Sequence, residues 1–165
     1  MPIVSNTSPI LNLAIIGELQ LLRAQFGEIL IPEAVLKELR ADEDLPGSHA
    51  ISEALNESWI QTSQLKQRSL AISLQRDIDK GESEAIALTI QNGYKSVLLD
   101  ERDGRKVAKS FGIKVVGAIG VLLLAWRQGE LDSFKVAMDK LREKAGFYIR
   151  DSLYDRLIEK AGDGD

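Results

Sequence analysis

The chain has 165 residues, of which 44% are hydrophobic, and this length is sufficient for one well-buried core. It contains no cysteine, which excludes disulfides and thiolate metal sites and suits a reducing cytosol. The net charge of -4 argues against a broad basic face of the kind that binds duplex nucleic acid through many phosphates. Any contact with nucleic acid must therefore be local.

The sequence gives no sign of membrane insertion or export. The longest apolar run, residues 115–126, is shorter than the roughly 20 residues that a membrane-spanning helix needs. The N-terminal stretch MPIVSNTSP lacks a basic n-region and an apolar h-region, so no signal peptide is predicted. We expect a cytoplasmic protein without membrane contacts. The one histidine, His49, lies in a polar loop pattern and is given no role.

Short β-rich runs alternate with helical patterns along the chain, which is typical of a mostly parallel sheet. The predicted strands are residues 2–5, 28–31, 59–62, 96–99 and 113–116. The predicted helices are residues 9–25, 33–40, 50–56, 66–77, 82–92, 102–111, 118–128, 131–144 and 151–161. Together these elements predict an α/β/α sandwich with a mostly parallel central sheet and additional C-terminal helices.

The chain is divided here into an α/β domain over residues 1–128 and a helical extension over residues 129–165. The tail carries an apolar stripe at Leu153, Leu157 and Ile158 with charges elsewhere. Such a stripe is consistent with packing on its own domain and equally with packing on a partner. The GVLLLAW stretch is expected in the core, although an exposed part of it would offer a face for a homodimer.

Polar side chains stand at three junctions between predicted strands and helices. Asn6 and Asp100 directly follow the first and fourth strands, and Glu82 opens the helix that leads into the fourth. In a parallel sheet these junctions lie at one edge, where open α/β sheets bind ligands. We therefore expect all three to face one crevice. The alternative is helix capping, by Asn6 or Ser8 in the first helix and by Asp100 in a later one.

The phase of each helix separates inward from outward glutamates. Residues two positions apart in a helix point about 200° apart, so Glu82 and Glu84 face nearly opposite sides. Glu82 falls inside the apolar arc and is predicted to point inward, whereas Glu84 falls outside it and is predicted to be solvated. The same test on PEAVLKEL turns Glu38 inward. An inward carboxylate needs a cation or hydrogen-bond donors.

Four motifs in order resemble those of the PIN domain: IVSNTSPILNLAIIGELQLL, LIPEAVLKEL, GESEAIAL and LLDERDGRKVA. The stretch IGVLLLAWRQGEL is similar to the bacterial and archaeal branch of predicted nucleic-acid-binding proteins, and the match covers residues 2–128. This resemblance implies an α/β/α sandwich and a ribonuclease that depends on Mg²⁺ or Mn²⁺. Many such proteins are toxins of toxin-antitoxin pairs, so RNA and a cognate antitoxin are the implied partners.

The resemblance also implies the functional residues. The metal site would consist of Asn6, Glu38, Glu82 and Asp100, with Glu101 or Asp103 as a further carboxylate, and Glu38, Glu82 and Asp100 would be the catalytic residues. Substrate contacts would come from the hydroxyl residues Thr7 and Ser8 and from the basic residues Arg102 and Arg105. Lys106 and Lys109 are expected on a solvated helix face.

One position departs from the family pattern, because PIN nucleases usually have aspartate where this chain has Asn6. An amide oxygen can bind a hard cation but brings no charge, so weaker metal binding is expected. A divalent-metal-dependent endoribonuclease explains Glu38, Glu82 and Asp100. A catalytically weak or inactive PIN module that binds RNA or a protein partner is the alternative that Asn6 favours. An aspartyl phosphotransfer domain that uses Asp100 explains neither inward glutamate.

Overall fold

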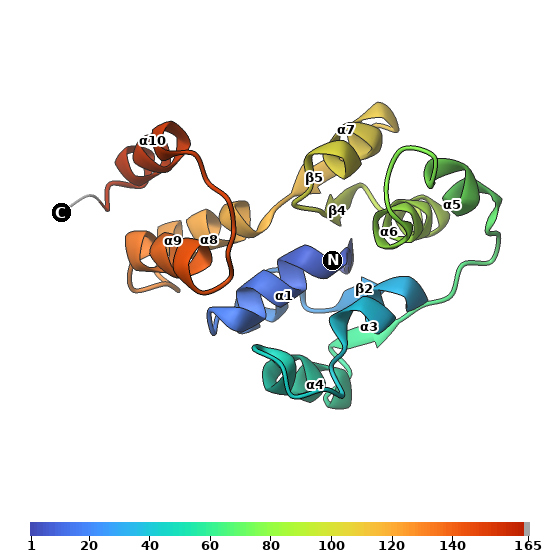
Figure 1. Cartoon of the computed structure of the whole chain (residues 1–165), viewed down its shortest axis with the longest axis horizontal. Coiled ribbons are helices and arrows are strands. Elements are labelled where there is room, and N and C mark those ends of the chain that lie inside the picture. The colour runs from blue at the N-terminus through green and yellow to red at the C-terminus, as the bar shows by residue number, and fades with distance from the viewer. Residues whose placement is uncertain (164–165) are drawn as a thin grey trace.

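The computed structural model describes residues 1–163 and contains one five-stranded sheet surrounded by helices (Figure 1). The strands are β1 (Ile3–Ser5), β2 (Ile29–Ile31), β3 (Ile60–Thr62), β4 (Ser96–Leu98) and β5 (Lys114–Val116). All neighbours are parallel, in the order β3-β2-β1-β4-β5. The predicted α/β/α sandwich with a parallel sheet is confirmed, and each strand lies within one residue of its predicted bounds.

The helices follow the predicted pattern with one exception. They are α1 (Thr7–Ile15), α2 (Gln20–Phe26), α3 (Glu33–Leu39), α4 (Ser48–Asn56), α5 (Ser69–Leu74), α6 (Lys80–Gln91), α7 (Arg102–Ser110), α8 (Ala118–Arg127), α9 (Phe134–Glu143) and α10 (Asp151–Ala161). The prediction of a single helix over residues 9–25 is wrong, because α1 ends before Gly17. Gly17 has φ of 79°, a left-handed conformation that glycine adopts without strain and that commonly ends helices.

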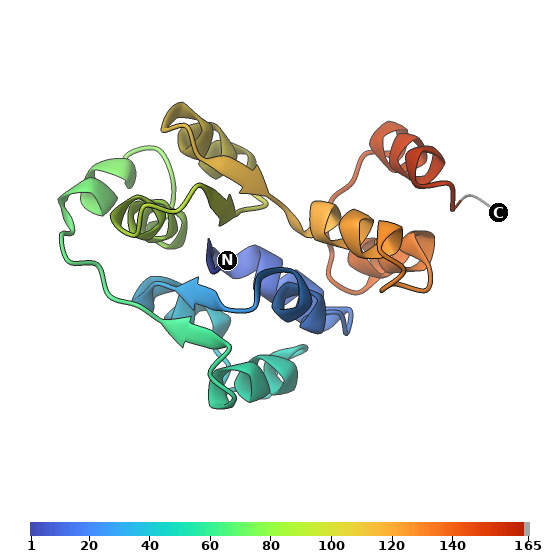
Figure 2. The same ribbon diagram turned by 180° about the vertical axis from the view of Figure 1, so that it is seen from behind.

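Side chains of the central strands alternate between two hydrophobic cores. Ile3 and Leu98 belong to the larger core, which the helices α1, α8 and α9 complete. Val4 and Val97 point to the opposite face, into the core formed with α6 and α7. Burial on both faces is what a parallel sheet covered by helices requires. Figure 2 shows the same layers from behind. Within residues 1–163, no helix combines the length and the apolar character needed to cross a membrane.

The C-terminal helices pack on α8 and on each other. Ile158 is buried in the larger core, and Leu153 and Leu157 pack against it, so the apolar stripe of α10 lies on its own chain. The indole nitrogen of Trp126 donates a hydrogen bond of 2.8 Å to the carbonyl of Ala161. The division of the chain at residue 128 stays a prediction, and residues 164 and 165 of the predicted extension lie outside the described residues.

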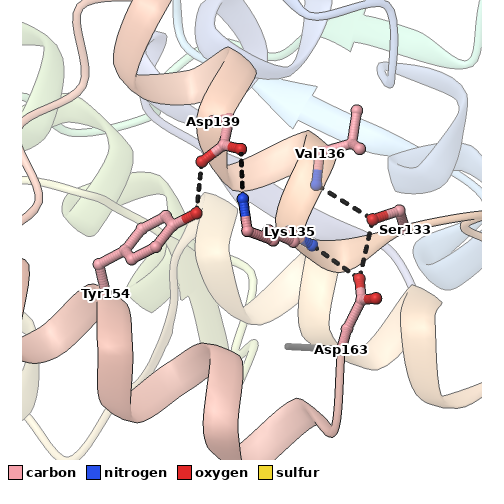
Figure 3. Close-up of polar contacts among 6 residues, drawn as sticks. All are labelled: Ser133, Lys135, Val136, Asp139, Tyr154 and Asp163. Atoms are coloured by element: carbon pink, nitrogen blue, oxygen red, sulfur yellow. Dashed lines mark hydrogen bonds and ion pairs between the residues drawn. The ribbon is translucent and has the colours of Figure 1, made fainter. Parts of the chain in front are cut away.

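Polar contacts join α10 and the residues after it to α9 (Figure 3). The Ser133 hydroxyl accepts a bond from the first turn of α9 and donates one of 2.8 Å to Asp163. Asp163 also accepts from the backbone N–H of Lys135, at 2.9 Å. Asp139 accepts from the hydroxyl of Tyr154 and from the Lys135 ammonium. These bonds supplement the apolar contact between the two helices.

Candidate metal centre

Asn6, Glu38 and the start of α6 meet at the carboxyl edge of the sheet. Asn6 follows β1, and its backbone N–H donates a bond of 3.0 Å to the carbonyl of Leu98, the last residue of β4. A methyl group placed on Gly81, in the first turn of α6, would lie 2.6 Å from Glu38 Oε1 and 3.0 Å from Asn6 Oδ1. The backbone of α6 therefore lies directly against both side chains, and only glycine leaves their oxygens this space.

Asn6 is only 2% exposed and occupies the cap position of α1. Asn6 therefore stands where the capping alternative predicted, but its side chain makes no capping hydrogen bond. Within residues 1–163 its buried Oδ1 has no hydrogen-bond partner. This oxygen remains available to a ligand.

Glu82 is 4% exposed and lies in the first turn of α6. Its Oε2 atom is buried and has no hydrogen-bond partner within the described residues. Burial raises the pKa of Glu82 to about 8, and the negative charges of Asp79, Glu101 and Asp103 act in the same direction. The carboxyl group thus points inward, as its helix phase predicted.

Asp79 is a neighbour that the sequence analysis missed. It caps α6 by accepting a bond of 2.8 Å from the backbone N–H of Glu82. Asp79, Glu82 and Glu101 each place one oxygen so that the three atoms lie within 4.8 Å of one another. They line a cavity of about 390 Å³, with Asp103 also in its wall. The available signal was an aspartate three residues before Glu82, which is the spacing of a helix cap.

Asp100 binds the start of α8. Its Oδ1 accepts a bond of 2.8 Å from the backbone N–H of Ala118, whereas Oδ2 is buried and has no partner among residues 1–163. The predicted alternative, capping of the helix after β4, is wrong, because the cap position of α7 belongs to Glu101. Burial raises the pKa of Asp100 to about 6, although the Ala118 bond, Arg105 and Asn12 lower it. The negative charge of Glu101 raises the pKa of both Asp100 and Glu82.

The two hydroxyl residues after Asn6 contact carboxylates. Thr7 Oγ1 donates a bond of 2.6 Å to Glu38, and Ser8 Oγ donates one of 2.7 Å to Glu101. These bonds orient the two acidic side chains. Glu38 lies beside Gly81 but is exposed, so the inward position that its helix phase predicted is wrong. Substrate contacts by Thr7 and Ser8, and by Arg102 and Arg105, stay predictions. Arg105 lines the same groove as Asp100, and its guanidinium donates a hydrogen bond of 3.4 Å to the carbonyl of Leu99.

The predicted exposure of Glu84 is wrong, because this residue is only 1% exposed. Its carboxylate accepts bonds from the backbone N–H of Ala34, at 3.2 Å, and from Arg68, at 3.0 Å. Helices α3 and α5 both pack against α6. Glu84 is consequently a buried, paired carboxylate that takes no part in the crevice.

The available donors fit a hard divalent cation. They are carboxylate and amide oxygens, the ligands that Mg²⁺ and Mn²⁺ prefer. Asn6, Glu82 and Asp100 each keep one buried oxygen without a partner in the described part of the chain. Leaving such atoms unsatisfied is costly unless a ligand shares them. Asp79, Glu82 and Glu101 form the acidic cluster that could hold a metal ion.

The strand order reverses between β1 and β4, and the acidic crevice lies at this switch point, where doubly wound α/β proteins bind ligands. The fold and the site thus define an α/β protein with a metal-competent crevice. A family model described as a PIN domain matches residues 2–163, and the chain belongs to the PIN domain family. This confirms the resemblance and extends it through α9 and α10. Comparisons with curated proteins and with solved structures gave no significant match.

Membership of this family indicates a nuclease-type function and binding of nucleic acid. PIN domains generally use divalent metals, and the acidic cluster is compatible with one.

Proposed function

We propose that the protein is a divalent-metal-dependent endoribonuclease of PIN type. The observation that carries the proposal is the pair of buried carboxyl groups of Glu82 and Asp100, each with one oxygen that lacks a protein partner within residues 1–163. A bound cation would give such oxygens a partner and would reduce the repulsion among the surrounding acids. The fit to Mg²⁺ and to Mn²⁺ is the same, since both ions take oxygen ligands.

The proposed ligands are Glu38, Glu82, Asp100 and the amide oxygen of Asn6, with Asp79, Glu101 and Asp103 at the margin. When bound, the ion lowers the pKa of a water molecule and neutralises charge that develops on the phosphate. The chain's own polar groups fix these ligands: Thr7 holds Glu38, and Ala118 holds Asp100. Glu82 is set by the cap that Asp79 gives to its helix turn.

RNA must approach a crevice whose carboxylates repel it. Arg102 lines both the acidic cavity and the groove next to it, and Arg105 lies in that groove beside Asp100. We assign to these two arginines the phosphate contacts on either side of the cleaved bond, because the guanidinium group matches phosphate geometry. The finer assignments, a toxin with a cognate antitoxin and a homodimer, stay predictions.

Metal binding by the folded protein should raise its melting temperature, since a ligand that binds only the folded state stabilises it by about 2.7 kcal/mol at a hundredfold excess over Kd. Glu82→Ala combined with Asp100→Ala should abolish the rise in Tm that Mn²⁺ causes. A matched pair of exposed acids, Glu28→Ala with Glu143→Ala, should leave it unchanged. An equal response to Mn²⁺ in both double variants would place the metal elsewhere.

The activity itself is tested with structured RNA in the presence of Mg²⁺, of Mn²⁺ and of a chelator. Cleavage with either ion, lost with chelator and in the Glu82→Ala, Asp100→Ala variant, is the expected result. Retention of RNA without cleavage would favour the second candidate, a PIN module that binds RNA without cutting it. The neutral side chain of Asn6 at the metal site is the observation on which that candidate rests.

Gly104→Ala should weaken Mn²⁺ binding by about tenfold, or about 1.4 kcal/mol. A methyl group on Gly104, in α7, would lie 2.5 Å from Glu82 Oε2 and must displace the carboxylate. Alanine favours the helix by about 1 kcal/mol, which offsets part of the clash and should leave the variant folded. Calorimetric titration measures the affinity.

Gly120→Ala in α8 is the control, because its methyl group would meet its nearest neighbour at an ordinary 3.9 Å. Its affinity for Mn²⁺ should match that of the wild type. If Gly104→Ala also binds Mn²⁺ as the wild type does, Glu82 is not a ligand.

A further inference from the structure

A groove of about 870 Å³ lies between α7 and α10, over β5 and the start of α8. Figure 1 shows α7 and α10 on opposite sides of the connection from β5 to α8. The groove shares Arg102 with the acidic cavity and is otherwise lined by different residues, Asp100 among them. The proposed catalytic chemistry leaves most of this surface without a role.

One wall of the groove is strongly basic. It is lined by five cations, Arg102, Arg105, Lys106, Lys109 and Lys114, and Asp100 is the one acidic residue in the lining. Within residues 1–163 none of these five takes part in a side-chain ion pair. The groove thus has a local excess of positive charge, although the whole chain has a net charge of -4.

The opposite wall is apolar and mainly aliphatic. It is formed by Ile119 and Leu124 of α8 and by Leu153 and Leu157 of α10. Leu124 is 42% exposed, so this wall offers apolar surface that the described chain does not cover. Phe147, before α10, adds a half-buried aromatic ring.

The floor of the groove is the edge strand β5, which pairs on one side with β4. The N–H of Lys114 donates to the carbonyl of Lys95, at 2.8 Å, and the carbonyl of Val116 accepts from Leu99, at 3.0 Å. Both residues therefore face β4. Because successive residues of a strand direct their backbone groups to opposite sides, Val115 presents its N–H and its carbonyl to the groove.

We infer that this groove binds an extended segment of a partner protein, with alternating acidic and apolar side chains, which adds to the sheet along β5. Side chains of an added strand alternate between the two faces of the sheet. One row would meet the cations of α7, and the other row would meet the aliphatic wall of α8 and α10. The backbone of Val115 would supply the hydrogen bonds that fix the register.

The wall chemistry favours a peptide over a single strand of nucleic acid. Bases bind chiefly by stacking on aromatic faces. The α8 and α10 wall presents leucine and isoleucine side chains, and the two phenylalanines of the lining, Phe26 and Phe147, are half-buried. Carboxylates match the opposite wall and apolar side chains match this one, so a single peptide satisfies both. Binding of the segment does not depend on the proposed ribonuclease activity.

A fluorescent peptide of alternating glutamate and valine tests the inference by anisotropy, with chelator present so that an RNA probe also stays intact. Lys106→Glu with Lys109→Glu should weaken peptide binding by about tenfold, since each exposed charge pair contributes about 0.5 kcal/mol and reversal adds repulsion. Leu124→Glu should weaken it through the apolar wall. Lys37→Glu with Lys144→Glu, two exposed lysines outside the groove, should change it by less than about twofold.

Strand addition has its own readout, because hydrogen exchange of the Val115 amide should slow when the peptide binds. Binding without this protection would rule out pairing with β5. Absence of peptide binding up to about 1 mM, or equal binding by both double lysine variants, would overturn the inference. A single-stranded RNA that binds in a Lys106-dependent and Lys109-dependent manner while the peptide does not would make the groove a nucleic-acid track. Failure of RNA cleavage leaves each of these outcomes unaffected.

Discussion

Glu82→Gln should stabilise the metal-free protein at pH 8 and reduce the pH dependence of its unfolding between pH 5 and pH 8. Burial raises the pKa of Glu82 from 4.5 to about 8, so the folded state keeps a proton that the unfolded state has released. The free energy of unfolding of the wild type must therefore fall as the pH rises through this window. The pKa shift corresponds to a loss of at most about 5 kcal/mol in the free energy of unfolding across this window. Because water screens the charges of the exposed acidic neighbours, we expect a loss of about 2 kcal/mol.

Urea unfolding at several pH values, with chelator, measures the effect. Glutamine preserves the shape of the side chain but cannot ionise. The plot of unfolding free energy against pH should therefore be flatter for Glu82→Gln than for the wild type, by the contribution of this one group. Glu143→Gln, at an exposed position, is the control and should follow the wild type. With Mn²⁺ at pH 8 the order should reverse, because the wild type gains a ligand and the variant loses one. Parallel profiles for wild type and Glu82→Gln would show that Glu82 does not hold the proton.

Asn6→Asp should tighten Mn²⁺ binding by about fivefold, or about 1 kcal/mol. Two unit charges about 4 Å apart interact by roughly 4 kcal/mol at an effective dielectric of 20, but desolvation and repulsion from Glu82 and Asp100 offset most of this. Without metal the same change should destabilise the protein by about 2 kcal/mol, because a further buried carboxylate then has no counter-charge. Aspartate and asparagine are equally good helix caps, so a cap effect cannot produce this loss.

Calorimetric titration and thermal melts with and without Mn²⁺ separate the two effects of Asn6→Asp. Asn56→Asp, at the exposed end of α4, should change neither quantity. Any ribonuclease activity should rise with the tighter site. If Asn6→Asp alters neither metal affinity nor metal-free stability, Asn6 lies outside the metal site and the inactive module becomes the better description.

The strands and the crevice could be predicted because both depend on local patterns and on one topological rule. Asn6 lies against the first turn of α6, which carries Glu82, as expected because strand ends in a parallel sheet share an edge. A common site of these two residues with Asp100 stays a prediction. Glu38 lies far along α3, so its approach to Gly81 depends on how α3 packs against α6. Asp79 could not be predicted as a site residue, because an aspartate that only caps a helix has the same sequence pattern as one that also binds a metal.

Glu84 shows the limit of helix phase as a guide to exposure. The method assumes that one side of a helix faces solvent, and α6 has no such side over residues 81–89, all of which are buried. The Glu84 carboxylate was therefore expected in water but pairs with the Ala34 amide of α3 and with Arg68, the residue before α5. The partners of Glu84, the Ala34 amide and Arg68, come from distant parts of the chain and leave no periodic trace in the sequence.

β1 is synthesised before the other four strands but ends at the centre of the sheet, between β2 and β4. Val4 pairs with Val97, so the central strand must wait for most of the chain before its second neighbour exists. Parallel pairing across such a separation in sequence is slow compared with the formation of local helices. A nascent chain carries Asn6 and Glu38 before Asp100 is added, so the proposed metal site can assemble only after β4 has been made.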